Sequence, residues 1–285
     1  MSQYVFVSDM FIQDYRGGAE LTTEALIRSM SSGSKFARTH SHTLTTDMLR
    51  DNAEFHYIVC NFASLRDDVK LFMCRNEIQY SIVEYDYKFC KYRSMEKHLA
   101  LENKKCDCVE KHAGKVNSAF YGYASKVWFM SEAQMNIFLT RIKVLKSENC
   151  EVLSSVFMPG DLAFMGAIKE NEKDGKYLIL GSNSWIKGTQ DCIQYANDNE
   201  LEFEIVSGLP YHELLIKMST SKGLIFLPLG ADTCPRFVIE AKLLGCDLRI
   251  NENVQHKDEP WFETQESTAA YLADRTSVFW SHYEG

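Results

Sequence analysis

The chain has 285 residues, of which 45% are hydrophobic and 25% are charged. This is an ordinary globular composition in a chain long enough for two domains. Its formal net charge of −8 argues against nucleic acid as the main partner, because proteins that follow a phosphate backbone usually carry a basic surface. No apolar run approaches the roughly 20 residues that a transmembrane helix needs, so we expect at most peripheral contact with a membrane.

The first ten residues, MSQYVFVSDM, lack a basic stretch before their short apolar run. We therefore expect them to open with a β-strand and not to act as a signal peptide. The nine cysteines are an odd number, and several stand in apolar runs. Together these features indicate reduced cysteines in a cytoplasmic protein.

Short apolar runs alternate with helical patterns along the first half of the chain. Strands are expected in residues 4–9, 55–62, 80–86 and 126–131. Helices are expected in residues 17–30, 65–76 and 132–142. Such alternation predicts βαβ units and a parallel sheet. Residues 88–125 are long, charged and rich in Cys and His, and they fit no simple βα unit.

The alternation is interrupted near Pro159 and Gly160 and by a charged connector, and then it restarts. Strands are expected in residues 176–182, 201–208, 223–228 and 246–251. Helices are expected in residues 187–199, 211–221 and 234–245. The pattern predicts an α/β protein with two Rossmann-like domains, residues 1–158 and 159–285, facing a cleft. The last helix is expected to pack back on the first domain.

Ligands of open α/β sheets bind beyond the carboxyl ends of the strands, so the loops there are expected to hold the chemistry. Gly17 and Gly18 stand at a predicted helix start, where backbone amides and the helix dipole favour an anion; a flexible turn is the alternative. Lys187 and Gly188 stand at another helix start. A lysine beside backbone amides suits a diphosphate, although a solvated lysine is the simpler interpretation.

Asp232 and Glu240 flank a third helix start, in the stretch FLPLGADTCPRFVIEAKLLGC. If the helix begins near Pro235, a favoured first-turn residue, its first amides can receive a negative ligand. Carboxylates accept hydrogen bonds from vicinal hydroxyls, as in a sugar or a ribose. A carboxylate in the apolar helix FVIEAKLLG is costly without a partner. The alternative is a residue at the rim that faces solvent.

Several stretches, in this order, resemble the retaining family-4 glycosyltransferases of the GT-B fold. They are GGAE after the first strand, MSEAQMNIFL, SSVFMPGDL, KG after the first strand of the second domain, and an acidic residue followed eight positions later by the Glu of EAKLLGC. The resemblance implies that Glu240 binds the ribose of a sugar nucleotide and that Asp232 contacts the transferred sugar. The donor-binding residues that it implies are Gly17, Gly18, Ser182, Lys187, Gly188, Thr233, Cys234, Arg236 and Glu240.

The chain departs from the family pattern at two places. Asp232 stands where the family usually has Glu, and Ser182 stands where it commonly has an Arg that contacts the diphosphate. Arg236 or Lys242 is a candidate to replace that charge. The sequence has no DxD-like magnesium motif of the kind DAD or DVD, which agrees with the metal-independent chemistry that the resemblance implies. We accordingly predict no cofactor besides the sugar nucleotide itself.

The acceptor-side catalytic residue of that family comes from a loop of the first domain. Glu84 and Asp86, at the end of a predicted strand, are the candidates, although Asp86 also suits a helix cap. His40 and His42 are further candidates, and on a strand they would share a face.

The segment from Cys90 to His112 is a possible soft-metal site, with Cys106, Cys108 and His112 as candidate ligands and Cys90 or His98 upstream. Its C-x-C spacing is not the C-x2-C of zinc knuckles, so a cluster of reduced cysteines is the favoured interpretation.

The sequence therefore predicts a retaining glycosyltransferase that moves a sugar from a nucleotide-diphosphate sugar to an acceptor. We expect the acceptor to be a glycan, a lipid or a small molecule. The alternative is a non-catalytic module of the same fold that binds a nucleotide or a glycan. An NAD-dependent enzyme is disfavoured because no G-x-G-x-x-G follows a strand.

Overall fold

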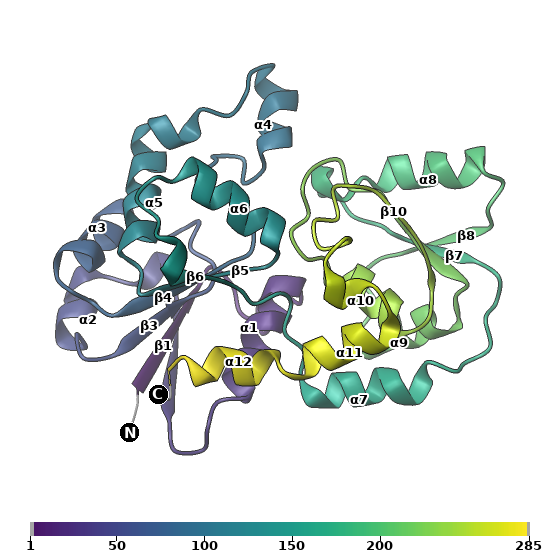
Figure 1. Ribbon diagram of the computed structural model, residues 1–285, viewed down its shortest axis with the longest axis horizontal. Helices are drawn as coiled ribbons and strands as arrows, with labels where there is room; N and C mark the ends of the chain where they lie inside the picture. The colour runs from purple at the N-terminus through teal and green to yellow at the C-terminus, as the bar shows by residue number, and fades with distance from the viewer. Residues whose placement is uncertain (1–2, 284–285) are drawn as a thin grey trace. The chain divides into compact units, whose positions relative to one another are not determined.

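The computed structural model describes residues 3–283. The chain divides into two compact domains, residues 1–156 with 278–285 and residues 157–277. The boundary lies two residues before the predicted one, and the end of the chain belongs to the first domain. Each domain is a parallel sheet with helices around it (Figure 1).

The sheet of the first domain has six parallel strands in the order β2-β1-β3-β4-β5-β6. The strands are β1 (Gln3–Ser8), β2 (Lys35–His40), β3 (His56–Val59), β4 (Tyr80–Glu84), β5 (Lys126–Phe129) and β6 (Cys150–Val152). The helices are α1 (Gly18–Arg28), α2 (Thr46–Asp51), α3 (Asp67–Arg75), α4 (Met95–Glu102), α5 (His112–Tyr123) and α6 (Glu132–Arg141). The segment that fitted no simple βα unit holds α4, a short 3-10 helix at Cys108–Glu110 and the whole of α5.

Helices cover both faces of this sheet (Figure 1). Helix α1 shares one face with the end of α12 (Arg275–Ser281), where the Trp280 indole N–H donates to the Leu26 carbonyl at 3.0 Å. Helices α3 and α5 pack against each other on the other face. The central strands are buried on both faces, which explains their continuous apolar runs.

The sheet of the second domain has four parallel strands in the order β10-β9-β7-β8. The strands are β7 (Tyr177–Leu180), β8 (Phe203–Val206), β9 (Gly223–Phe226) and β10 (Asp247–Ile250). The helices are α7 (Pro159–Ile168), α8 (Thr189–Asp198), α9 (Tyr211–Thr220), α10 (Arg236–Leu243) and α11 (Gln265–Ala273). The two predicted parallel-sheet, Rossmann-like domains are therefore confirmed.

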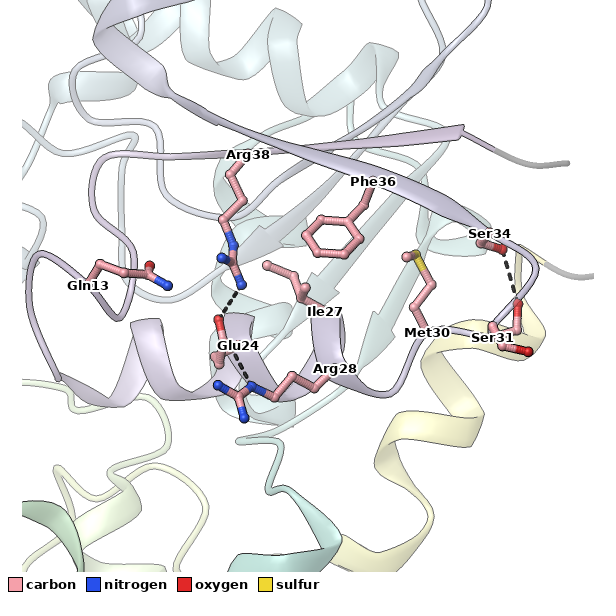
Figure 2. Close-up of a pocket in the computed structure, with 10 residues that line it drawn as sticks. Gln13, Glu24, Ile27, Arg28, Met30, Ser31, Ser34, Phe36 and Arg38 are labelled. Carbon is pink, nitrogen blue, oxygen red and sulfur yellow. Dashed lines mark hydrogen bonds and ion pairs between the residues drawn. The ribbon is translucent and has the colours of Figure 1, made fainter.

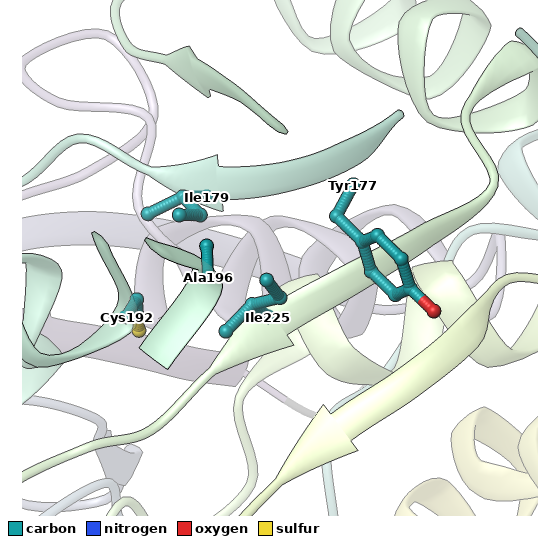
Figure 3. Close-up of a cluster of buried hydrophobic side chains, with 5 residues drawn as sticks. All are labelled: Tyr177, Ile179, Cys192, Ala196 and Ile225. Atoms are coloured by element: carbon teal, nitrogen blue, oxygen red, sulfur yellow. The ribbon is translucent and has the colours of Figure 1, made fainter. Parts of the chain in front are cut away.

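Part of the core of the second domain lies between α8 and the two central strands (Figure 3). Its fully buried members are Tyr177, Ile179, Cys192, Ala196 and Ile225. Burial of this apolar surface stabilises the domain at about 25 cal/mol per Å². The packing fixes α8, and thus the loop before it, against the carboxyl ends of β7 and β9.

Two details of the structure bear on the predictions above. His42 lies in a 3-10 helix, Ser41–Thr43, because β2 ends at His40. The expectation that His40 and His42 share one strand face was therefore wrong. Within residues 3–283, no helix has the combination of length and hydrophobicity that spanning a bilayer requires.

The strand order of each sheet reverses at one point. In the first domain the chain leaves β1 for β2 on one side and continues to β3 on the other. In the second domain it leaves β7 for β8 and returns to β9 on the far side. The crevice beyond the carboxyl ends at such a reversal is the usual ligand site of an open α/β sheet.

Candidate functional site

The loops after β7 and β9 meet at the reversal point of the second domain. Lys187, in the loop after β7, donates through Nζ to Asp232 Oδ2, in the loop after β9, at 2.6 Å. A backbone bond from Leu229 N to Ile186 O, at 3.0 Å, joins the same two loops. Both charged side chains stay partly exposed, Lys187 at 29% and Asp232 at 12%. Two residues selected from the sequence are thus in direct contact.

Gly188 makes this close approach possible. Its φ of +59° lies in the left-handed region, and a Cβ there would stand 2.2 Å from the Leu227 carbonyl oxygen. Any other residue would meet both backbone strain and a collision with the loop after β9. Gly188 is also the N-cap of α8. Glycine is therefore required at this position for steric reasons. Its lack of a side chain lets the loops after β7 and β9 approach each other.

Ser182 takes part in the turn that begins the loop after β7. Its backbone N–H donates to Thr189 Oγ1 at 3.1 Å, and that hydroxyl donates to the Leu180 carbonyl at 2.8 Å. The Ser182 hydroxyl accepts a hydrogen bond from Ser184 N at 3.1 Å. Ser182 lies in the loop after β7, at the reversal point of the sheet, and it brings no positive charge.

The segment after β10 supports Asp232. The Asp232 amide donates to the Asn253 carbonyl at 2.8 Å, and Gln255 N donates to the Asp232 carbonyl at 3.1 Å. The side-chain amides of Asn251 and Asn253 both donate to the Pro228 carbonyl, at 3.0 and 2.7 Å. The sequence analysis did not select these asparagines. The signal was present, since one asparagine ends a predicted strand and a second follows two residues later.

Helix α10 begins at Arg236, with Pro235 as its N-cap, where the sequence predicted it. Glu240 is 2% exposed and accepts hydrogen bonds through Oε1 from the Tyr211 hydroxyl at 2.9 Å and from Arg236 Nε at 3.3 Å. Arg236 Nη2 donates to Tyr211 at 3.0 Å. The guanidinium carbon lies 3.7 Å from the centre of the Phe157 ring. These residues form a buried polar network in which the carboxylate has its partner.

Burial raises the pKa of Glu240, and the neighbouring Arg236 charge opposes that rise. Burial also raises the pKa of Tyr211, and the nearby Glu240 carboxylate adds to it. The Arg236 guanidinium is committed to this network and is 4% exposed. It therefore offers little to a ligand as a replacement for the missing loop arginine. Lys242 donates to the Glu263 carbonyl at 2.9 Å.

Thr233 and Cys234 connect Asp232 to α10, and both are buried. The first turn of α10 follows directly, so the positive end of the helix dipole stands next to this segment. Within the second domain, the predicted donor-binding residues thus lie on the loops after β7 and β9 and on α10.

In the first domain, α1 begins at Gly18 with Gly17 as its N-cap. The buried Glu20 carboxylate lies against this helix start, because a Cβ on Gly17 would be 2.6 Å from Glu20 Oε2. Burial raises the pKa of Glu20, while the backbone N–H groups of Glu20 and Gly17 lower it. A carboxylate of the protein therefore stands where the sequence analysis expected an external anion.

Glu84 ends β4 and is fully buried. It accepts hydrogen bonds from Lys88 Nζ at 2.8 Å, from Asp86 N at 2.9 Å and from the Tyr121 hydroxyl. Asp86, 20% exposed, pairs with Arg93, whose Nε lies 2.6 Å from Oδ2, and with Lys88 at 3.2 Å. Of the two predicted acceptor-side carboxylates, only Asp86 is partly accessible to solvent.

The two carboxylates differ in how they titrate. Burial raises the pKa of Glu84 to about 7, although the Lys88 charge acts against it. Burial acts in the same sense on Asp86, but the charges of Lys88 and Arg93 outweigh it and lower its pKa. Asp86 is therefore the carboxylate of the pair that stays ionised at neutral pH.

Asp9 occupies the reversal point of the first sheet and was not selected from the sequence. Its carboxylate accepts hydrogen bonds from Ala63 N and Ser64 N, both at 2.9 Å, and from the Ser41 hydroxyl. These bonds tie the loop after β1 to the loop after β3. The position of Asp9 at the end of a predicted strand was the available signal.

A surface pocket of about 500 Å³ lies between α1 and β2 (Figure 2). Figure 2 shows that its charged groups already pair with each other. Glu24 accepts from Arg28 at 2.6 Å and from Arg38 at 2.7 Å. None of the residues predicted from the sequence lines this pocket.

The candidate metal ligands Cys90, Cys106 and Cys108 come together in the first domain. The histidine that joins them is His98, because His112 has an 85% exposed side chain and lies 3.8 Å from an Asp67 oxygen. The helical positions explain the difference, since His98 points inward from α4 whereas His112 opens α5 at the surface.

No protein-family model matches the sequence, and no curated relative matches it. Several solved structures share its fold. Anabaena HepE in complex with UDP and glucose has a TM-score of 0.55 at 10% identity, over 99% of this chain and 95% of the other. The trehalose-6-phosphate structure from E. coli, bound with UDP-2-fluoro glucose, has a TM-score of 0.55 at 10% identity, over 97% and 95%.

A third similar structure is UDP-GlcNAc 2-epimerase from Neisseria meningitidis bound to UDP-GlcNAc. It has a TM-score of 0.50 at 10% identity, over 99% of each chain. At these identities the similarity establishes the fold. All three of these proteins were solved with a UDP-sugar, or with UDP and a sugar.

Proposed function

We propose that the chain is a retaining glycosyltransferase whose donor is a UDP-sugar. The observation that carries the proposal is the contact between Lys187 and Asp232. It joins the two loops at the reversal point of the second sheet, where ligands of this kind of fold bind. The three similar structures named above, each bound to a UDP-sugar or to UDP and a sugar, support the choice of ligand.

Lys187 is the proposed partner of the diphosphate. A lysine ammonium has three N–H donors, and one of them is engaged by Asp232. The others remain for phosphate oxygens at a partly exposed position. The first turn of α10 adds the positive end of a helix dipole. Positive groups held at the diphosphate stabilise the charge that develops as the donor bond breaks.

Asp232 is proposed to contact the transferred sugar, with Thr233 and Cys234 helping to seat it. Glu240 is proposed to bind the ribose of the nucleotide, as the resemblance implies. Its contacts with Arg236 and Tyr211 give it a second task, because they keep a buried guanidinium paired. A variant at Glu240 therefore changes stability as well as binding.

On the acceptor side, Asp86 is the better candidate of the predicted pair. It is ionised and partly exposed, whereas Glu84 is enclosed by Lys88 and Tyr121. We propose that Glu84 positions Lys88, which in turn holds Asp86. Retention and independence of a metal are further parts of the proposal, carried by the family resemblance.

A non-catalytic module that binds a nucleotide or a glycan is the second candidate. The observation that favours it is the shortage of positive charge. Ser182 replaces the usual arginine, and Arg236 is committed to Glu240. Lys187 then faces the diphosphate with less help than the resemblance implies, which would slow departure of the leaving group more than it weakens binding.

A thermal-shift series with UDP, UDP-glucose, UDP-GlcNAc, GDP and ADP tests the proposal. A ligand at 100 times its Kd should stabilise the folded chain by about 2.7 kcal/mol. NMR of the best donor then distinguishes the candidates. Release of UDP and sugar indicates a transferase, conversion of the sugar in UDP-GlcNAc indicates an epimerase, and binding alone indicates a module. The absence of any shift with uridine diphosphates would reject the proposed donor.

A further inference from the structure

We propose that the first domain binds one zinc ion through Cys90, His98, Cys106 and Cys108, in a structural site separate from the sugar-nucleotide site. All four residues are buried, and one ligand atom from each lies within 4.8 Å of the others. Three thiolates and one imidazole form one of the standard four-coordinate sets for structural zinc.

The distances within the cluster fit a single ion. His98 Nδ1 lies 3.5 Å from Cys108 Sγ and 3.7 Å from Cys90 Sγ. With zinc–sulfur bonds of about 2.3 Å and zinc–nitrogen bonds of about 2.0–2.1 Å, tetrahedral geometry puts such a pair about 3.6 Å apart. Cys106 Sγ lies within 4.8 Å of the other three ligand atoms. The four ligand atoms thus lie close enough together to surround one ion.

The surroundings of His98 are those of a metal-bound histidine. With Nδ1 bound to the ion, Nε2 would carry the proton, and it lies 3.5 Å from Glu102 Oε2. Among the residues that the structure describes, Nε2 has no conventional hydrogen bond. The other Glu102 oxygen is held by the Tyr92 hydroxyl at 2.8 Å and by Lys91. A carboxylate behind a histidine ligand fixes its orientation and raises its basicity.

Charge around the cluster also agrees with a bound ion. Zinc with three thiolates and a neutral imidazole carries one net negative charge. The Arg141 guanidinium donates to the Cys106 carbonyl at 3.2 Å, so a positive charge stands close by. The rival state is four neutral groups, in which the Cys90 thiol donates to the Ser94 carbonyl at 3.3 Å. That state leaves the His98 ring facing two sulfurs without a strong partner.

The site would join three parts of the chain. Cys90 lies in the loop after β4, His98 lies on α4, and Cys106 and Cys108 lie in the segment before α5. The loop after β4 also carries Asp86. One ion would therefore fix α4 and this loop together. Such a closed site contributes to folding and takes no part in bond making.

The metal content of the purified full-length chain, measured by mass spectrometry after expression with zinc, is the first test. We expect about one zinc per chain, removable by a strong chelator. Replacement by Co²⁺ should give the ligand-field bands of a tetrahedral ion and thiolate charge-transfer absorption. Cys106→Ser should lose the metal and these bands, whereas Cys150→Ser, a matched change at a half-buried cysteine outside the cluster, should keep both.

Glu102→Gln provides a variant that should fold even if Cys106→Ser does not, since its side chain is 30% exposed. Loss of an outer-shell carboxylate should weaken zinc binding about 10–100-fold. Glu148→Gln, at an exposed glutamate elsewhere in the domain, should have no effect.

Hydrogen exchange should show faster opening of residues 85–110 after zinc is removed. A chain with no bound metal and no tetrahedral Co²⁺ spectrum would overturn the proposal. Equal Co²⁺ binding by the chain and its Cys106→Ser variant would also overturn it, as would a disulfide between any two of Cys90, Cys106 and Cys108.

Discussion

Replacing Glu240 by alanine removes the carboxylate from the buried network of α10. Arg236, 4% exposed, keeps its hydrogen bond to Tyr211 and its contact with the Phe157 ring, but it loses the Glu240 carboxylate as an ion-pair partner. Breaking a buried pair in this way costs about 3–5 kcal/mol. A whole domain is stable by only about 5–15 kcal/mol, so Glu240→Ala should lose a large part of its stability.

Urea unfolding, followed by circular dichroism, measures this loss. With a slope of about 2 kcal/mol per molar urea, a loss of 3 kcal/mol lowers the midpoint by about 1.5 M. Glu240→Gln should lose less, because the amide oxygen still accepts from Tyr211. The double variant Arg236→Met/Glu240→Leu should recover most of the stability, since apolar replacement of a buried pair is often neutral or better.

A different outcome would refute this account of the network. If Glu240→Ala loses less than about 1 kcal/mol, Arg236 is solvated or re-paired and the carboxylate is not its main partner. If the double variant is as unstable as the single one, the loss comes from packing and not from an unpaired charge.

Three other predictions follow from single residues. In thermal melts, Gly188→Ala should destabilise the second domain by more than the roughly 1–2 kcal/mol of left-handed backbone strain. Gly175→Ala, at φ +83° with open space around it, should show the cost of the strain alone. Equal losses in the two variants would mean that the loop after β9 moves aside freely. Ser182→Arg should tighten UDP binding by up to about tenfold, or about 1.4 kcal/mol, in calorimetry, and weaker binding would mean that the site has no room for a second cation. Burial lowers the pKa of His256 to about 3. Below about pH 6.5 the unfolded chain therefore binds a proton at this residue that the folded domain does not. The free energy of unfolding should fall by up to about 1.4 kcal/mol per pH unit as the pH decreases from about 6.5 toward 3. Between pH 7 and pH 5.5, the melting temperature should fall less in His256→Phe than in the unmodified chain. His42→Gln, at an exposed histidine, should leave the fall unchanged. The same fall in His256→Phe as in the unmodified chain would assign it to other titrating groups.

The fold was largely accessible from the sequence because buried parallel strands have a clear pattern. Continuous apolar runs located the four strands of the second sheet and the four central strands of the first. The edge strands β2 and β6 were missed, because exposed or half-buried strands carry no such run. The start of α10 was predicted near Pro235, which is the N-cap of the helix and not its first residue. The region from residue 88 to 125 was not accessible in this way. Its order depends on contacts among distant cysteines, histidines and charged groups, and periodicity does not record such contacts.

Pairing partners in the site were harder to predict than site residues. Asp232 and Lys187 were both selected, but their mutual contact depends on how closely two loops approach, which the Gly188 backbone decides. Glu240 was expected to bind a ribose. In the structure it pairs with Arg236, which lies one turn before it on the same helix. An Arg four residues before a Glu on a predicted helix is a signal that the sequence analysis could have used. The choice of His98 over His112 as the histidine of the cysteine cluster likewise depends on which side of a helix faces inward.

Calorimetric titration of UDP and of uridine into the chain and into Lys187→Ala tests the central claim most directly. The account predicts saturable UDP binding by the chain and much weaker uridine binding. Lys187→Ala should lose about tenfold or more in affinity for UDP, in line with the 1.5–3 kcal/mol of a charged hydrogen bond, with little change for uridine. No saturable UDP binding by the chain, or an equal loss for both ligands in the variant, would contradict a diphosphate site at Lys187.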